Sequence, residues 1–479
     1  MRRWMVTACA LFVALASTTL ALSAAGGDDS LLPNEKHFLD KLSGKTSKGV
    51  KGGSAFNMVA VGQNDIGGRG FNGDVFVHNG LAYVGRWGFF ERQHPGFCPQ
   101  DGGIAVFDVS DPANPKQVAD LPGSGASVED VEAYTASYGA LAGHEIAVVG
   151  TQYCVGPRTD PAAAGHRGLD LWDVTTPNAP VKLGTYDAGC CNRGVHEFEV
   201  GDRADLGKTL VYASVPFAER ADPDSPTGVR DLAGKGEARI IDITEPRNPV
   251  ELSTFGIKKD LGLDPAAGQG CFALSFGHGM NISDDGTTLF VSYWDAGFIS
   301  LDVTNPSAPS FLGRWTYAPN EDGDGHSTSY DGARKLLFGA DEDFCKGGPA
   351  VPGWGYLRVF DASNPGALKQ IGSYRTPNSL GPADPGAGDY VIHNPLVVGT
   401  DVYLSWYTDG IRVVDTRNPA NPVEVANFVP PAAQNPIKPA QRGTLTNTTQ
   451  VWGVAVDEST GLVYASDMNS GLWIIERTD

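Results

Sequence analysis

The sequence predicts an all-β fold built from seven repeated units, and three observations lead to it. The first is a recurring motif: an apolar run, an aspartate, a turn with proline three or four residues later, and a second apolar run. Its aspartates, 54 to 69 residues apart, are Asp108, Asp173, Asp242, Asp302, Asp361 and Asp415, and a degenerate seventh copy lies at residues 471–476. Self-similarity at this period indicates a repeat architecture.

The second observation is that two further strand signals precede the aspartate in each unit. In the clearest copy, residues 278–292, an Asp-Asp-Gly turn separates the two strands. The second strand ends in a small residue in every unit: Gly85, Gly150, Ser214, Ser292, Gly339, Ser405 and Ser466. Small side chains at one register let neighbouring sheets approach an axis, so each unit is expected to hold four strands, A to D.

The third observation concerns the chain ends. The seventh unit stops after its third strand, whereas residues 55–61 resemble a fourth strand that lies ahead of the first unit. Pairing this strand with residues 471–476 closes a ring and removes an exposed sheet edge. The sequence therefore predicts a seven-bladed β-propeller with four-stranded blades, closed by an N-terminal strand, as a single domain over residues 53–479.

The N-terminus predicts export. A basic start, an apolar run and a small-residue exit indicate a signal peptide over residues 1–25, with an uncleaved membrane anchor as the alternative. Residues 26–52 are expected to form a flexible leader. The protein is therefore expected to be secreted, periplasmic or on the cell surface, with no membrane span after signal cleavage. The net charge of −20 argues against nucleic acid as a partner.

Three runs carry a family resemblance: Arg239–Asp242, Ile299–Asp302 and Arg412–Asp415, each followed by a turn of the Asn-Pro-x-x-Pro kind. They resemble the LVIVD-repeat family of secreted or surface propellers, over essentially the whole mature chain. The resemblance implies the fold and export, and it implies no single activity. A WD40 propeller is excluded because the units are too long and lack the Gly-His partner of the Trp-Asp pair.

Connectivity decides which loops share a face of such a propeller. The D–A and B–C connections lie at one end of each blade, and the proline turns lie at the other. Long insertions fall on the first face, at residues 86–102, 152–167, 216–236 and 341–355. Varied loops on a rigid scaffold usually carry function. The first functional hypothesis is therefore a secreted binding or interaction scaffold that uses this face to hold a protein, a glycan or a small molecule.

The second hypothesis rests on four histidines that begin strand A in consecutive units: His196, His278, His326 and His393. Because blades repeat by rotation, these imidazoles are expected to converge at one mouth of the axis. Six further residues are expected around them: Asn72, Glu129, Glu197, Asp341, Glu342 and Trp452. Imidazoles beside carboxylates could hold a divalent transition metal.

This second hypothesis makes the protein a metal-dependent enzyme for oxidation or hydrolysis, with substrate or water entering near Asn72 and Trp452. The alternative for the same histidines is a hydrated, polar channel without an ion. An acidic stretch nearby, with Asn320, Asp322 and Asp324, either binds calcium weakly or forms a solvent-exposed turn.

Cysteine usage fits an exported protein. Of seven cysteines, Cys9 leaves with the signal peptide, and the other six lie in loops of the insertion face. Cys98 and Cys154 occupy equivalent B–C loops of adjacent units, so they are expected to form a disulfide. The remaining four allow three pairings, which the sequence leaves open: Cys190, Cys191, Cys271 and Cys345.

Overall fold

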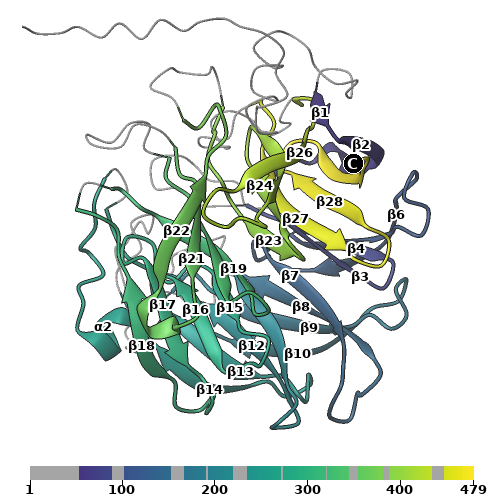
Figure 1. Ribbon diagram of the computed structural model, residues 1–479. Coiled ribbons are helices and arrows are strands. Elements are labelled where there is room, and N and C mark those ends of the chain that lie inside the picture. The colour runs from purple at the N-terminus through teal and green to yellow at the C-terminus, as the bar shows by residue number, and fades with distance from the viewer. Residues whose placement is uncertain are drawn as a thin grey trace, which may run out of the picture.

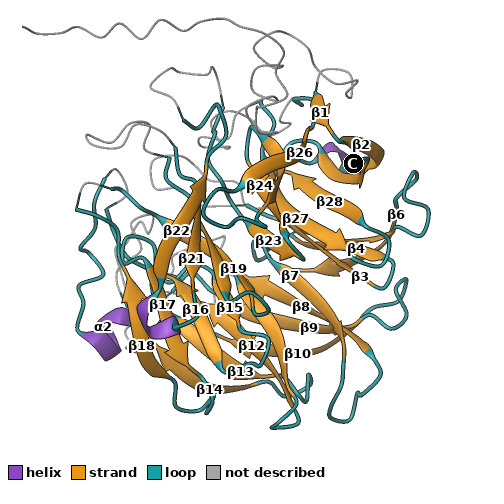
Figure 2. Cartoon of the chain, in the orientation of Figure 1, coloured by secondary structure: helices purple, strands orange, loops and turns teal. Residues whose placement is uncertain are grey.

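The chain folds into a seven-bladed β-propeller in the computed structural model (Figures 1 and 2). The structure describes residues 53–88, 102–123, 125–152, 167–189, 192–219, 235–270, 273–319, 321–344, 354–380, 388–433 and 447–479. The expected signal peptide and leader lie outside these residues, so both stay predictions. Among the described residues, no helix is long and apolar enough to cross a membrane.

Each blade is an antiparallel sheet, and in the first five blades the four strands follow one another in chain order. Blades one and two contain β3 (Asn72–His78), β4 (Leu81–Arg86), β5 (Gly103–Asp108), β6 (Lys116–Pro122), β7 (Val131–Thr135), β8 (Glu145–Thr151), β9 (Gly168–Asp173) and β10 (Val181–Asp187). Blades three and four contain β11 (Phe198–Arg203), β12 (Lys208–Ser214), β13 (Ala238–Asp242), β14 (Val250–Phe255), β15 (Met280–Ile282), β16 (Thr288–Ser292), β17 (Phe298–Asp302) and β18 (Ser310–Trp315).

The remaining blades follow the same plan. Blades five and six contain β19 (Gly325–Asp331), β20 (Leu336–Asp341), β21 (Leu357–Asp361), β22 (Lys369–Tyr374), β23 (Pro395–Val398), β24 (Asp401–Trp406), β25 (Gly410–Asp415) and β26 (Val423–Val429). Blade seven contains β27 (Val451–Asp457), β28 (Leu462–Asp467), β29 (Gly471–Arg477) and, from the N-terminus, β2 (Met58–Asn64). Short helical turns are η1 (Ile66–Gly68), α2 (Ile257–Leu261) and η2 (Pro365–Ala367).

The expected ring closure is confirmed, with a shift in the bounds of the closing strand. β2 pairs antiparallel with β29 and supplies the missing fourth strand of blade seven. The preceding residues form β1 (Ser54–Phe56), which adds a fifth strand to blade six by pairing with β26. Asn57 separates β1 from β2 and has a φ of 51°, which turns the chain from one blade to the next. Asparagine tolerates this left-handed conformation better than most residues.

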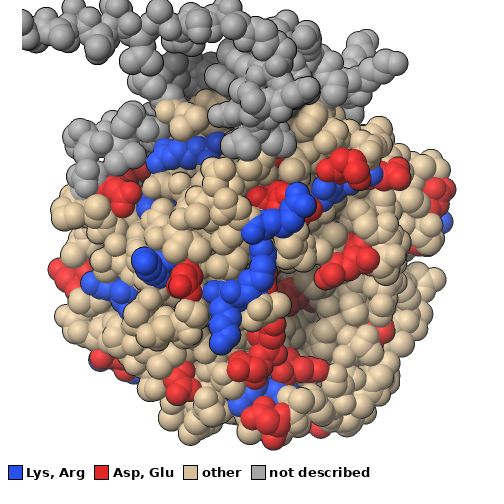
Figure 3. Space-filling model, in the orientation of Figure 1, with Lys and Arg blue, Asp and Glu red and all other residues tan. Residues whose placement is uncertain are grey.

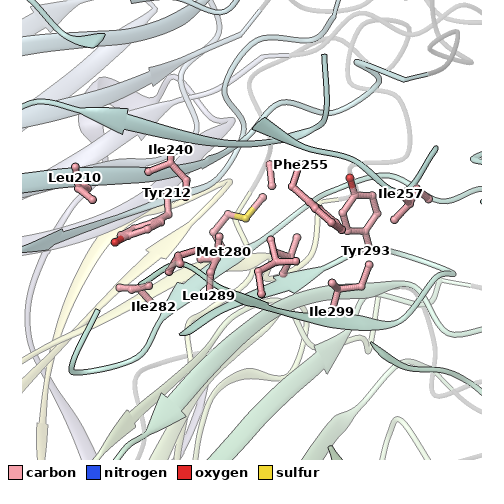
Figure 4. Close-up of a cluster of buried hydrophobic side chains, with 14 of the residues drawn as sticks. Leu210, Tyr212, Ile240, Phe255, Ile257, Met280, Ile282, Leu289, Tyr293 and Ile299 are labelled. Carbon is pink, nitrogen blue, oxygen red and sulfur yellow. The ribbon is translucent and has the colours of Figure 1, made fainter. Parts of the chain in front are cut away.

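Hydrophobic side chains fill every seam between blades. Seven clusters of buried residues in the described part of the chain each join two adjacent blades. Figure 4 shows the seam between blades three and four, where Tyr212 and Ile240 face Met280 and Leu289. An equivalent cluster joins blade seven to blade one, so the core itself closes the ring.

The recurring aspartate ends the third strand of each of the first six blades with a side-chain cap. In each copy its carboxylate accepts the backbone N–H two residues further on, at 2.8–3.0 Å. This bond turns the chain into the proline-containing loop that leads to the fourth strand. The repeated aspartate is therefore explained by local turn chemistry and is not a sign of a shared ligand site.

A β-bulge between the third and fourth strands also recurs, in all seven blades. A glycine lies at this bulge in four fourth strands and packs against the turn of the next blade: Gly62, Gly184, Gly313 and Gly372. A Cβ at any of them would lie 2.0–2.3 Å from a backbone oxygen of that turn. β2 therefore has the same bulge and the same contact as strands in the middle of the chain.

Charged side chains of both signs are spread over the face of the molecule shown in Figure 3. On the face shown in Figure 3, acidic and basic side chains of the described residues lie interspersed. A narrow stripe of basic side chains crosses this face, with acidic side chains on both sides of it (Figure 3).

Candidate metal centre

The four histidines singled out in the sequence lie together on the axis. His326 is the second residue of β19, and the other three each lie two residues before the innermost strand of blades three, four and six. Ring centroids of consecutive histidines are 4.3, 3.9 and 4.2 Å apart. Each side chain is buried, at most 5 % exposed. We call these four residues, with Glu129, Glu197 and Glu342, the histidine cluster.

Hydrogen bonds assign the tautomer of His393. Its Nδ1 lies 2.8 Å from the backbone oxygen of Trp452, in blade seven. A carbonyl oxygen only accepts, so Nδ1 carries the hydrogen and Nε2 presents a lone pair. That Nε2 is buried and has no hydrogen-bond partner among the described residues.

His326 is held in the same tautomer by a neighbouring hydroxyl. Ser327 Oγ donates to the backbone oxygen of His393 at 2.9 Å, so it accepts the hydrogen of His326 Nδ1, 3.1 Å away. The lone pair is therefore on His326 Nε2. This nitrogen lies 3.6 Å from Glu197 Oε1 and 3.6 Å from Glu342 Oε2.

His196 and His278 contact each other through their Nε2 atoms, next to Glu129. His196 Nδ1 lies 2.5 Å from Glu129 Oε2, and the two Nε2 atoms of His196 and His278 lie 2.8 Å apart. One of these Nε2 atoms carries a hydrogen and the other a lone pair, while His196 Nδ1, although close to the carboxylate, has no hydrogen-bond partner among the described residues. His278 Nδ1 lies 3.8 Å from Glu197 Oε2 and has no hydrogen-bond partner among the described residues either.

The histidine cluster offers groups of ligand atoms that could each hold one metal ion. Ligand atoms lie within 4.8 Å of one another in three overlapping sets: Glu197, His278 and His326; His326, Glu342 and His393; Glu129, Glu197 and His393. Two ligands on a tetrahedral zinc ion, at bond lengths of about 2.0–2.1 Å, lie about 3.3 Å apart. The observed separations of 3.6 and 3.8 Å are close to this distance. The residues present therefore suit a divalent transition metal.

Burial sets the electrostatics of the cluster. It lowers the pKa of each of the four imidazoles well below 6.5, so they are neutral, the form that binds metal. Burial also raises the pKa of Glu129 and of Glu342 to about 8. The pKa of Glu197 is raised well above 4.5 by burial and then by the nearby carboxylates. A bound cation would offset this repulsion and keep the carboxylates ionised.

Two of the other expected residues lie elsewhere. Asp341 turns into blade five, where its carboxylate is 2.6 Å from Arg358 Nε and accepts from the Tyr317 hydroxyl at 2.8 Å. Asn72 is fully buried, and its Nδ2 donates to the backbone oxygen of Asp467 at 3.0 Å. Neither side chain has a described contact with a histidine of the cluster.

Aromatic rings fill the half of the axis expected to be open. The Trp452 ring packs on His393, with centroids 4.2 Å apart, and Trp87 packs on Trp452 at 5.1 Å. Phe71 continues this stack, and the rings of Phe71, Trp87 and Trp452 belong to one hydrophobic cluster. Trp452 is only 7 % exposed. Trp452 therefore contacts the histidine cluster through its backbone carbonyl and through the face of its ring.

Two functional partners were missed in the sequence. Ser327 orients His326, and the Tyr407 hydroxyl donates a short hydrogen bond to Glu342 Oε1. Ser327 follows a candidate histidine directly, which is a weak signal. Tyr407 lies in blade six and reaches Glu342 of blade five, a contact that sequence patterns do not reveal.

The cysteines lie outside the described residues. This holds for Cys98 and Cys154 and for the four cysteines whose pairing was left open. The expected Cys98–Cys154 disulfide stays a prediction.

Comparisons with known proteins give one family match and several structural similarities. The LVIVD repeat family model matches residues 98–120, 276–316 and 351–376, so the chain contains LVIVD repeats. No curated protein matches the chain. Among solved structures, the β-propeller domain of Cps50 (Swd1) from Myceliophteria thermophila is 10 % identical, with a TM-score of 0.48, and the match covers 86 % of this chain and 98 % of that one. The computationally designed Ika8 protein is 9 % identical, with a TM-score of 0.45 and coverages of 87 % and 98 %.

Proposed function

We propose that this chain, a seven-bladed β-propeller with LVIVD repeats, is a binding scaffold that holds a divalent transition-metal ion in its histidine cluster. One observation carries the proposal. Hydrogen bonds place the hydrogens of His326 and His393 on Nδ1, which leaves a lone pair on each Nε2, and the Nε2 of His326 lies 3.6 Å from both Glu197 and Glu342. Partners of this kind are typical of metal-binding histidines.

The position of the cluster supports a role in binding. Each histidine opens or precedes an A strand, and Glu342 follows the B strand β20, so the cluster lies at the end of the axis with the D–A and B–C connections. β-Propellers generally serve as binding scaffolds. We infer that the ligand, a protein, a glycan or a small molecule, binds on this loop face after export of the protein.

A second candidate function is catalysis at the ion, by metal-assisted hydrolysis or oxidation. It is favoured by the donor sets: two of the three combine two imidazoles with one carboxylate. Catalytic zinc and non-haem iron sites commonly use such three-ligand sets, which leave coordination positions for water or substrate. The ion would then supply a Lewis acid or a metal-bound water.

Zinc titration of the chelator-treated full chain, in competition with a chromophoric chelator, tests the proposal. We expect the cluster to take up one ion per chain. His326→Ala removes a ligand and should lower the affinity by at least about 100-fold, since even an orienting partner is worth 10–100-fold. Ser327→Ala removes only the acceptor for His326 Nδ1–H and should lower the affinity by about 10–100-fold.

The matched control is His144→Ala. His144 is a surface histidine, 44 % exposed, that pairs with Asp173 at 2.8 Å. Its loss should leave zinc affinity unchanged. If His326→Ala binds zinc as tightly as the unmodified chain does, the ion is held elsewhere and the histidine cluster is a hydrated channel.

A further inference from the structure

Two acidic residues face each other at the edge of the histidine cluster, outside the metal centre. The backbones of Trp294 and Gly325 form an antiparallel bridge between blades four and five, with N···O distances of 3.1 and 3.3 Å. Their sequence neighbours, Asp295 and Asp324, therefore lie opposite each other. Asp322 is close by, and ligand oxygens of the three carboxylates lie within 4.8 Å of one another.

Asp324 is the most unusual of the three. It is 1 % exposed, its Oδ1 is buried, and this atom has no hydrogen-bond partner among the described residues. No described ion pair includes Asp324 or Asp295. Like charges directly opposite one another in a sheet are destabilising, and so is a buried carboxylate without a partner. Either a bound cation or a proton on one of the carboxyl groups must therefore offset this repulsion.

We propose that Asp295, Asp322 and Asp324 form a calcium site, separate from the histidine cluster. An all-carboxylate donor set is hard, which suits Ca²⁺ and not the softer transition metals. At Ca–O distances of about 2.3–2.6 Å, ligand oxygens on one ion lie up to about 5 Å apart. Asp295 is already oriented, because its Oδ2 accepts the backbone N–H of Leu274 at 2.9 Å.

The site would tie together two segments that position histidines. Asp295 follows Trp294, whose ring stacks on His278 with centroids 5.3 Å apart. Asp324 precedes His326 by two residues. A calcium ion would thus fix blade four to blade five where both contribute to the axis, and it would stabilise the fold whether or not a transition metal is bound.

Calorimetric titration of the chelator-treated full chain with CaCl2, together with its melting temperature, tests the site. We expect one calcium ion per chain. At ten times Kd, binding should raise the melting temperature by about 2 °C for a chain of this size. Asp324→Asn should abolish both signals. Without calcium, this variant should melt at or above the temperature of the unmodified chain, because opposed charges have been removed.

A second variant and a control complete the test. Asp295→Asn should behave as Asp324→Asn does, which keeps the site testable if one variant fails to fold. Asp264→Asn, in an exposed turn of the preceding loop, should respond to calcium like the unmodified chain. The site is refuted if the unmodified chain shows neither heat nor a melting shift at about 10 mM Ca²⁺, above the usual 10⁻⁴–10⁻³ M range of extracellular sites. A full calcium response in Asp324→Asn would refute it equally.

Discussion

Adding one methyl group to the closing strand should open the ring at a defined seam. A Cβ at Gly62 would lie 2.0 Å from the backbone oxygen of Pro112 and 3.2 Å from Pro115 Cδ, both in the turn between β5 and β6 of blade one. Ordinary contacts are longer by more than 1 Å, so Gly62→Ala must displace β2 or that turn. Overpacking of this kind typically costs about 1–3 kcal/mol of stability.

The same substitution can be made in a seam formed by continuous chain. Gly184 has the equivalent contact between blades two and three, where an added Cβ would lie 2.3 Å from Pro246 O. If β2 is a true fourth strand, Gly62→Ala and Gly184→Ala should lower the free energy of unfolding by similar amounts. Val59→Ala is the control, because this side chain of β2 is 43 % exposed and its loss should change stability by about 0.5 kcal/mol or less.

Guanidinium unfolding measures the cost, and hydrogen exchange shows where it arises. In Gly62→Ala, backbone amides of β2 and β29 should exchange faster, because these two strands pair where the ring closes. Those of β17, in blade four, should exchange at an unchanged rate. Truncation through Asp65 should lower the melting temperature sharply, whereas deletion of residues 27–50 should not. A Gly62→Ala protein as stable as the unmodified chain would show that β2 does not lie in this register.

Three further predictions concern single positions. Asp302→Ala removes the acceptor for the amide two residues on and should lower the free energy of unfolding by about 1 kcal/mol in denaturant titrations; no change would refute the capping role. Burial, opposed by the hydrogen bond from Gly277 N, raises the pKa of Glu237 from 4.5 to about 8, so its stabilising contribution is complete below pH 4.5 and is lost as the pH rises through 8. Glu237→Gln should therefore flatten the fall in stability between pH 5 and 8 by up to about 1.4 kcal/mol per pH unit, and equal slopes would contradict this. Non-reducing peptide mapping of exported protein should find Cys98 linked to Cys154, and a free Cys98 thiol would refute the pair.

The fold was predictable because each repeat needs the same turn-capping residue and the same small residue at the same positions. The aspartate of each motif caps a turn, and that need recurs in each of six blades. The small residue that ends the second strand is explained by close approach: a Cβ at Gly85 would lie 2.3 Å from the backbone oxygen of Glu129 in the next blade. The division of the N-terminal segment into β1 and β2 was missed, although Asn57 offered a signal for a left-handed turn.

The histidine cluster was predictable in position and not in detail. Rotation of one blade onto the next brings equivalent residues together, which is why four strand-opening histidines meet. The direction of a side chain at the end of a strand is harder to predict than its position, because successive residues point to opposite sides of the sheet. Asp341 and Glu342 are adjacent, yet the first binds Arg358 inside its blade and the second faces His326. Tautomers depend on contacts between blades, such as Ser327 with the His393 carbonyl, which no local pattern contains.

X-ray absorption at the zinc edge, on the zinc-loaded full chain, would show directly which atoms hold the ion. The histidine cluster predicts nitrogen and oxygen neighbours at about 2.0–2.2 Å, with the outer-shell scattering of imidazole rings, and loss of that pattern in His326→Ala. The sequence also predicts cysteines in the loops of the same face, and thiolates are strong zinc ligands. Sulfur neighbours at about 2.3 Å would place the ion on those cysteines and would contradict a metal centre on the propeller axis.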